Sequence, residues 1–307
     1  MEKHWLISAF KSSQLTCIVM YTLILLFVST SAFANQTNQI RYIESKKYPD
    51  PKQSYFVDLL TLILNATKEE FGDYTLKPVA FEMSQARTSA SLKRNEFIDI
   101  HWRMTSQQLE QDLQAIYIPI LKGLMGYRIF IIRKGEQDKF SREISLTELQ
   151  DRPLGQGYNW PDTEILEDNN FNVVKGYDIY LLSMLKKNRF DYFPRALHEP
   201  WFEIKTEPSL VIEDNFLLKY PAPMFFFINK NNLHLKKRLE LGFSKIIESG
   251  VFEHFFQSHP ITANLLTKVN FNQRISFTLT NASLTERTKA LIKDERLWIN
   301  TKIQNEQ

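Results

Sequence analysis

Hydrophobic and polar positions alternate along this chain in two different periods, and the alternation predicts strands and helices in turn. Short apolar runs at residues 40–43, 97–102 and 127–132 have the length expected of strands. Between the first two runs, apolar residues recur at the spacing of one helix face: Phe56, Leu59, Leu60, Ile63 and Leu64. The 127–132 run is uninterrupted, which is typical of a parallel strand buried on both faces. Strands that alternate with helices indicate an α/β protein.

The second half of the chain continues this pattern. A helix is expected from Pro161, because proline suits the first helical turn and Asp162 complements the positive end of the helix. Further strands and helices are predicted by their apolar periods: strands at 189–193, 210–212, 224–228 and 275–279, and helices at 180–185 and 235–247. Asn231 or Asn232 would cap the last helix and Gly250 would stop it. A final helix is predicted from a capping box, Ser283-x-x-Glu286.

Residues 1–34 have the features of a secretory signal peptide. A basic start with Lys3 and Lys11 precedes an apolar run from Leu15 to Val28, and Ala32-Phe33-Ala34 is a small-residue cleavage signal. The alternative is an N-terminal membrane anchor that stays uncleaved. The only cysteine, Cys17, would leave with the peptide, so we expect a periplasmic protein that folds by core burial without disulfides.

Charge and motifs narrow the classes of function. The chain has 38 Lys and Arg against 35 Asp and Glu, a formal net charge of +3, so no strong field attracts nucleic acid. Nucleophile elbows, zinc-protease helices and phosphate-binding loops are absent from the sequence, and its six histidines are scattered. We therefore expect no enzyme, no cofactor and no metal. A carboxylate pair acting as in glycosidases stays an alternative, since sequence does not give spatial separation.

Several short blocks resemble one known family by their order along the chain. They are residues 55–60 (YFVDLL), 93–99 (KRNEFID), 118–120 (IPI), 127–130 (YRIF), 149–162, 189–191 (RFD), 226–231 and 250–252. In this order they resemble the amino-acid-binding class of periplasmic solute-binding proteins, the extracellular solute-binding protein family 3 with its type II periplasmic-binding-protein fold. The resemblance covers about residues 36–258.

The resemblance implies a fold and a division of the chain. Such proteins have two α/β lobes joined by crossing segments, here expected near 121–126 and 220–223, and the lobes close on a ligand by a hinge. The implied parts are a signal peptide (1–34), a first lobe (35–122 and 224–270), a second lobe (123–223) and a C-terminal extension (271–307).

The chain departs from the family at the two positions that would bind the charges of an amino acid. Family members place an arginine after a Thr-rich turn to hold the ligand carboxylate, whereas Met104-Thr105-Ser106 is followed here by Glu110-Gln111-Asp112. An aspartate that takes the ligand ammonium follows the family's Arg-x-Asp strand, but here Asp191 is followed by Tyr192-Phe193-Pro194-Arg195. Either the pocket is rebuilt for another small solute, such as an anion held by Arg103 or Arg195, or the cleft no longer binds an amino acid.

Six residues are candidates for ligand binding: Trp102, Arg103, Thr105, Tyr158, Trp160 and Arg195. Arg103 ends a predicted strand at the edge where α/β sheets bind ligands. Arg195 either faces the cleft or pairs with Glu199 or Asp191. The aromatic candidates either stack on a flat ligand or fill the core.

Two further motifs leave similar alternatives open. Gly155-Gln156-Gly157 either directs backbone N–H groups at an anion or makes a plain tight turn. His198-Glu199 is either an acid–base pair or structural.

The sequence thus predicts a monomeric binding protein that captures a small polar solute, amino-acid-like or anionic, without chemistry. The resemblance implies an ABC-type membrane permease or a sensor as the partner. Alternatives are an accessory protein that keeps the fold without transport, and a secreted hydrolase.

Overall fold

The structure is a computed structural model and describes residues 38–44, 46, 50 and 52–301. The predicted signal peptide, its alternative as an anchor and Cys17 lie outside these residues. Among the helices that the structure describes, none combines the length and the apolar character needed to span a bilayer.

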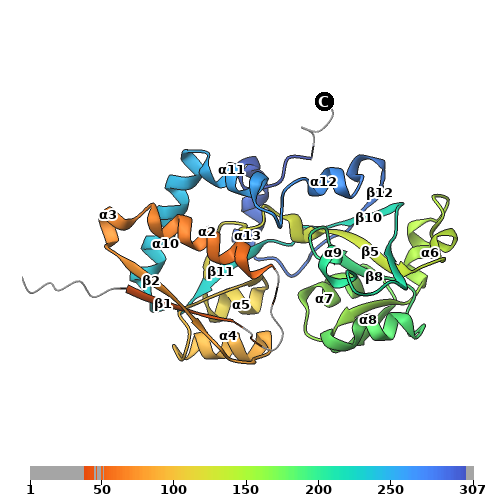
Figure 1. Cartoon of the computed structure of the whole chain (residues 1–307), viewed down its shortest axis with the longest axis horizontal. Helices are drawn as coiled ribbons and strands as arrows, with labels where there is room; N and C mark the ends of the chain where they lie inside the picture. The colour runs from red at the N-terminus through yellow and green to blue at the C-terminus, as the bar shows by residue number, and fades with distance from the viewer. Residues whose placement is uncertain (1–37, 45, 47–49, 51, 302–307) are drawn as a thin grey trace, which may run out of the picture.

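Two lobes lie side by side, each built on its own sheets (Figure 1). In the first lobe, β1 (Asn38–Ile43) pairs in parallel with β2 (Tyr74–Val79), while β11 (Met224–Ile228) is the centre of an antiparallel sheet between β3 (Ile100–Met104) and β4 (Gln114–Ile116). The helices of this lobe are α2 (Gln53–Asn65), α3 (Lys68–Phe71), α4 (Gln85–Lys93), α5 (Gln107–Asp112), α10 (Leu233–Glu248) and α11 (Val251–Ser258).

The second lobe is organised around β5 (Tyr127–Arg133). This strand pairs antiparallel with β8 (Phe193–Ala196), β9 (Leu210–Ile212) and β10 (Phe216–Lys219), and β12 (Ile275–Thr278) adds to β10 in parallel. A separate parallel pair joins β6 (Leu154–Gly157) to β7 (Val173–Gly176). The helices here are α6 (Leu146–Asp151), α7 (Pro161–Asp168), α8 (Asp178–Lys186) and α9 (Pro200–Glu203). Short helical segments complete the chain: η1 (Leu124–Gly126), η2 (Gln137–Phe140), α12 (Leu265–Lys268), η3 (Phe271–Gln273), α13 (Glu286–Ala290), η4 (Leu291–Lys293) and η5 (Glu295–Leu297).

The long periodic helices confirm the sequence prediction. The apolar face of α2 is fully buried and packs on α10, where a Cβ added to Gly242 would lie 2.5 Å from the carbonyl oxygen of Ile63. This contact brings the two helices close and requires a residue without a side chain. Asn232 caps α10 as predicted, since its side chain accepts a hydrogen bond from the Leu235 N–H at 3.1 Å.

Four local predictions are wrong. Strand β5 has a buried interior, as predicted, but it is antiparallel to β8, β9 and β10, so burial on both faces did not require a parallel sheet. The 97–102 run becomes a strand only from Ile100, since Phe97 has a left-handed φ of 58°. The 189–193 run yields β8 only from Phe193, because the backbone before it bonds to the end of α8 and to β6. The final helix begins at Glu286 and Thr285, rather than Ser283, caps it.

Gly155-Gln156-Gly157 does not form the tight turn that the sequence offered. These residues form the buried strand β6. A Cβ on Gly155 would lie 2.1 Å from the ring of Phe190, so the glycine allows the strand to pack directly against an aromatic side chain.

Two connections between the lobes touch each other at the hinge. The chain passes from β4 to β5 and returns from β10 to β11. The Tyr220 N–H donates to the Gly126 carbonyl at 2.9 Å, and a Cβ on Gly126 would lie 1.8 Å from the Tyr220 carbonyl oxygen. Glycine at position 126 therefore permits the two connections to run in contact.

Candidate functional site

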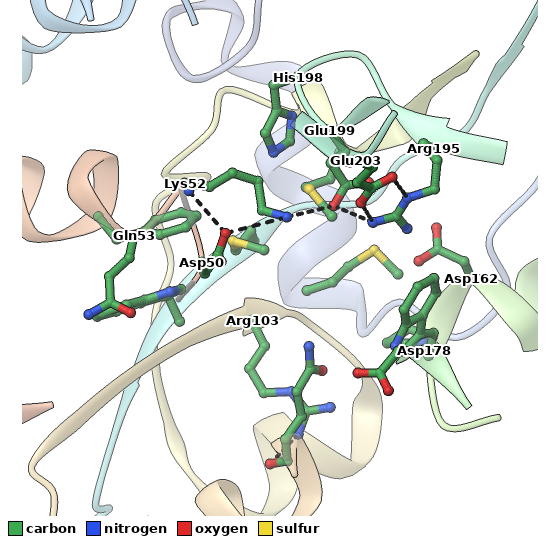
Figure 2. Close-up of a pocket in the computed structure, with 18 of the residues that line it drawn as sticks. Asp50, Lys52, Gln53, Arg103, Asp162, Asp178, Arg195, His198, Glu199 and Glu203 are labelled. Carbon is green, nitrogen blue, oxygen red and sulfur yellow. Dashed lines mark hydrogen bonds and ion pairs between the residues drawn. The ribbon is translucent and has the colours of Figure 1, made fainter. Parts of the chain in front are cut away.

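A cavity of about 670 Å³ lies between the two lobes, and both lobes line it. Its lining is rich in charged and aromatic side chains, several of them drawn in Figure 2. From the first lobe come Lys52, Phe56, Trp102, Arg103 and Met224 among others, and from the second lobe Arg128, Trp160, Asp162, Asp178, Arg195, His198, Glu199 and Glu203.

A chain of opposite charges crosses the cavity from one lobe to the other (Figure 2). Lys52 Nζ lies 3.6 Å from a carboxylate oxygen of Asp50 and 3.6 Å from Oε1 of Glu199. Arg195 in turn lies 3.2 Å from Glu199 and forms a bidentate pair with Glu203, with Nε donating at 2.8 Å and Nη2 at 2.5 Å. Glu199 is therefore the carboxylate that links a cation of each lobe.

Arg128 forms a second, more deeply buried cluster beside this chain. Its guanidinium donates to Asp162 and lies 3.5 Å from Glu199, and the Tyr220 hydroxyl also donates to Asp162 at 2.6 Å. Burial alone would lower the pKa of the Arg128 guanidinium, but Asp162, Tyr220 and Glu199 raise it. Because Tyr220 lies in the connection between β10 and β11, this cluster ties the hinge to the cavity wall.

The paired cations also set the ionisation of Glu199. Burial alone would raise the pKa of the Glu199 carboxyl, but the positive charges of Arg195 and Lys52 hold it well below its usual range. The same burial would lower the pKa of Arg195, and Glu199 and Glu203 raise it instead. These groups stay charged in the folded protein and neutralise one another.

Arg103 differs from the other cations of the cavity. Its Nη1 donates to the Gln85 carbonyl at 3.2 Å and to the Ser89 hydroxyl at 2.7 Å, both on α4. Within residues 52–301, no carboxylate lies at ion-pair distance from it, and burial lowers the pKa of its guanidinium to about 10. Arg103 is thus held by neutral acceptors of its own lobe.

Four of the six residues predicted for ligand binding line this cavity. Trp102 stacks on Phe56 with ring centroids 5.1 Å apart, and Arg195 lies 4.8 Å over the ring of Trp160. Arg103 is the fourth. For Arg195 the structure shows the alternative interpretation, a pair with Glu199, together with the bidentate pair to Glu203.

The other two predicted residues lie elsewhere. Tyr158 is exposed and contacts the ring of Tyr177 at 5.3 Å outside the cavity lining. Thr105 is buried and its hydroxyl donates to the Glu110 carboxylate at 2.6 Å. That carboxylate also accepts from the Thr285 and Thr288 hydroxyls at 2.6 and 2.7 Å. At the position where the resemblance led us to look for a clamp arginine, Glu110 therefore anchors the C-terminal extension.

Sequence reasoning missed most of the acidic side of the cavity. Asp50, Asp178 and Glu203 belong to no motif, nor does the basic Lys52, and the sequence indicates Asp162 only as a residue at the start of a helix. One signal was present in the sequence: Glu199 and Glu203 follow Arg195 by four and eight residues. Among residues 52–301 the structure shows no group of three His, Cys, Asp or Glu side chains placed to hold a metal ion.

Two lobes with a cavity between them, each lobe a layered α/β sheet, define the type II periplasmic binding protein fold, and solved structures of that fold match this chain. A Salmonella typhimurium periplasmic binding protein with high arginine specificity matches at a TM-score of 0.52 and 14% identity, over 72% of this chain and 98% of its own. A probable amino-acid ABC transporter extracellular-binding protein from Bacillus subtilis matches at 0.53 and 17%, over 72% and 97%.

A third match belongs to signalling rather than transport. It is a histidine kinase sensor domain with similarity to periplasmic binding proteins, with a TM-score of 0.51 and 15% identity over 72% of this chain and 95% of its own. No family model and no curated protein sequence matches the chain. At these identities the similarity establishes the fold, and the resemblance drawn from the sequence holds at that level.

Proposed function

We propose that the chain is a monomeric periplasmic binding protein that takes a small polar solute into the interlobe cavity and performs no chemistry. The observation that carries this proposal is the cavity itself, because its wall is shared by both lobes and charged side chains face it from each. Ligand-binding cavities of this size, with aromatic walls and a few polar groups, are typical of small-molecule sites. The structural neighbours include both transport and sensor proteins, so a permease or a sensor is the partner we propose.

We further infer that the solute carries a positive charge. Among the residues that the structure describes, the cavity is lined by the carboxylates Asp50, Asp162, Asp178, Glu199 and Glu203, with Glu82 at its edge, against the cations Lys52, Arg103, Arg128 and Arg195. Burial lowers the pKa of both lining histidines, His101 and His198, to about 3, so neither adds positive charge at neutral pH. The excess of negative charge favours an amine-bearing, amino-acid-like solute over the anionic solute that the sequence also allowed.

A thermal-shift screen of the purified chain tests this proposal. The panel contains basic amino acids, diamines, neutral amino acids, sugars and small carboxylates. A ligand at a hundred times its dissociation constant should add about 2.7 kcal/mol of stability, which raises the melting temperature measurably. We expect shifts among the amines only. Shifts confined to carboxylates would reverse the charge assignment, and a folded sample with no shift at all would contradict solute binding.

Asp178→Asn is the variant that addresses the acidic wall most directly. Asp178 is exposed at the start of α8 and lines the cavity, and among the described residues no cation pairs with it. A lost hydrogen bond between charged groups costs about 1.5–3 kcal/mol, so we expect the dissociation constant of an amine hit to rise about tenfold or more by calorimetry. Asp138→Asn, on the exposed η2 segment of the same lobe, is the matched control. Equal affinities in the two variants would remove Asp178 from the site.

A further inference from the structure

The C-terminal part of the chain crosses between the lobes two more times, in addition to the two hinge connections. After α11 in the first lobe, the chain enters the second lobe at α12, and after β12 it returns to the first lobe at α13 (Figure 1). Residues 265–299, which we name the strap, therefore begin on one lobe and end on the other.

The first half of the strap is fixed to the second lobe. Strand β12 extends the sheet by pairing in parallel with β10 over four residues, and the Leu279 N–H continues the ladder to the Lys219 carbonyl at 2.8 Å. Buried Arg274 donates to the carbonyls of Glu213 and Phe216 at 2.6 and 3.0 Å. These contacts make this half a structural part of the second lobe.

The second half is fixed to the first lobe through Glu110. The Thr285 and Thr288 hydroxyls donate to the Glu110 carboxylate at 2.6 and 2.7 Å, and Thr288 is fully buried. Arg287 lies 3.7 Å over the ring of Tyr117, which also donates to Glu110 at 3.2 Å. Glu110 lies on α5, 175 residues from Thr285 and 178 from Thr288 along the chain, so this anchor is a long-range contact.

The strap also holds both hinge connections directly. Asn281 donates to the Pro221 carbonyl at 2.8 Å, which is in the β10–β11 connection. In the other connection, Lys122 Nζ donates to the Arg296 carbonyl at 2.6 Å and the Ile299 N–H donates to the Lys122 carbonyl at 2.8 Å. The Trp298 ring lies on Gly123, whose φ of 74° and lack of a side chain accommodate it.

We propose that the strap restrains rotation of the two lobes about the hinge. Domain closure by a hinge needs only a few residues to change φ and ψ when nothing else links the domains. Here Lys122 and Pro221 are hydrogen-bonded to the strap and Gly123 lies against the Trp298 ring. A rotation must also bend the strap between its two anchors, or separate it from Glu110 or from β10. The proposal concerns the range of lobe motion and holds whichever solute the cavity takes.

Distances between two spin labels, measured by pulsed electron paramagnetic resonance, test the restraint. The labels go on Ala86→Cys in α4 and Lys187→Cys at the end of α8, in full-length chain that also carries Cys17→Ser. Both positions are exposed, and α4 and α8 lie on the side of the molecule opposite the strap, where rotation moves them furthest (Figure 1). In the labelled protein with an unmodified strap, the distance between the two labels should have one narrow distribution.

The double variant Thr285→Val/Thr288→Val lacks the two hydroxyl donors to Glu110, while the shape of each side chain changes little. We expect its distribution to broaden and its mean to shift to longer distance, while Thr278→Val on the exposed face of β12 leaves both unchanged. Should the double variant fail to fold, Trp298→Ala releases the hinge contact instead and should broaden the distribution in the same way. A broad distribution already in the unmodified protein, or distributions that coincide in folded variants, would overturn the proposal.

Discussion

Replacing Arg128 with alanine is expected to lower the free energy of unfolding by about 3–5 kcal/mol, because removing one partner of a buried ion pair leaves uncompensated charge behind. The Arg128 side chain is 1% exposed and holds both Asp162 and Glu199. In its absence Asp162 would keep only the Tyr220 hydroxyl among these contacts. Urea denaturation followed by circular dichroism measures the loss as a lower midpoint.

Arg94→Ala is the matched control for Arg128→Ala. Arg94 also pairs with a glutamate, Glu96 at 2.8 Å, but its side chain is 59% exposed. Exposed pairs contribute about 0–1 kcal/mol, so the midpoint should change little. Adding Asp162→Asn to Arg128→Ala should recover part of the loss, since Asp162 is the carboxylate left without a cation, whereas Glu199 keeps Arg195 and Lys52. A cost below about 1 kcal/mol for Arg128→Ala would show that the cluster does not stabilise the fold.

The sequence predicted the elements that local periodicity determines. Helices α2 and α10 carry continuous apolar faces, and β11 is a strongly apolar run, so each is recognisable without its neighbours. Strand β6 shows the limit of this reasoning. Its glycines look like turn residues, and only the rings packed against them, Phe190 on Gly155 and Trp160 on Gly157, explain why the strand needs them.

The cavity was less predictable, because its side chains are brought together by long-range contacts. Arg128 is 34 residues from Asp162 and 71 from Glu199 in the sequence, and Glu110 is 178 residues from Thr288. No local spacing encodes such pairs. Arg195 illustrates the consequence: the sequence offered Glu199 as a possible partner, whereas the bidentate pair with Glu203 became apparent only in the fold.

Acid should destabilise the protein from about pH 6.5 downward, well before most carboxylates protonate. Burial lowers the pKa of His198 and of His101 from 6.5 to about 3. At His198, Glu199 opposes this shift, while the positive charges of Lys52, Arg128 and Arg195 add to it. At His101, the positive charge of Arg103 adds to it. Between pH 6.5 and about pH 3, both histidines are protonated in the unfolded chain and neutral in the folded protein. Stability therefore falls as pH falls through this window.

Each histidine contributes about 1.4 kcal/mol of lost stability for each pH unit below 6.5, so the two together should give about 2.8 kcal/mol per unit. Urea midpoints measured between pH 7.5 and 4.5 give this slope. His198→Phe should roughly halve it, because the substituted side chain cannot take up a proton in either state. His254→Gln, on the exposed face of α11, is the control and should retain the full slope.

Below pH 4.5 the loss of stability should steepen, since Arg195 and Lys52 hold Glu199 ionised and it must then be protonated against their positive charges. A midpoint that stays constant from pH 6.5 to 4.5 would mean that both histidines take up protons in the folded protein, and with them the cavity would carry two more positive charges than the proposed amine-binding site allows.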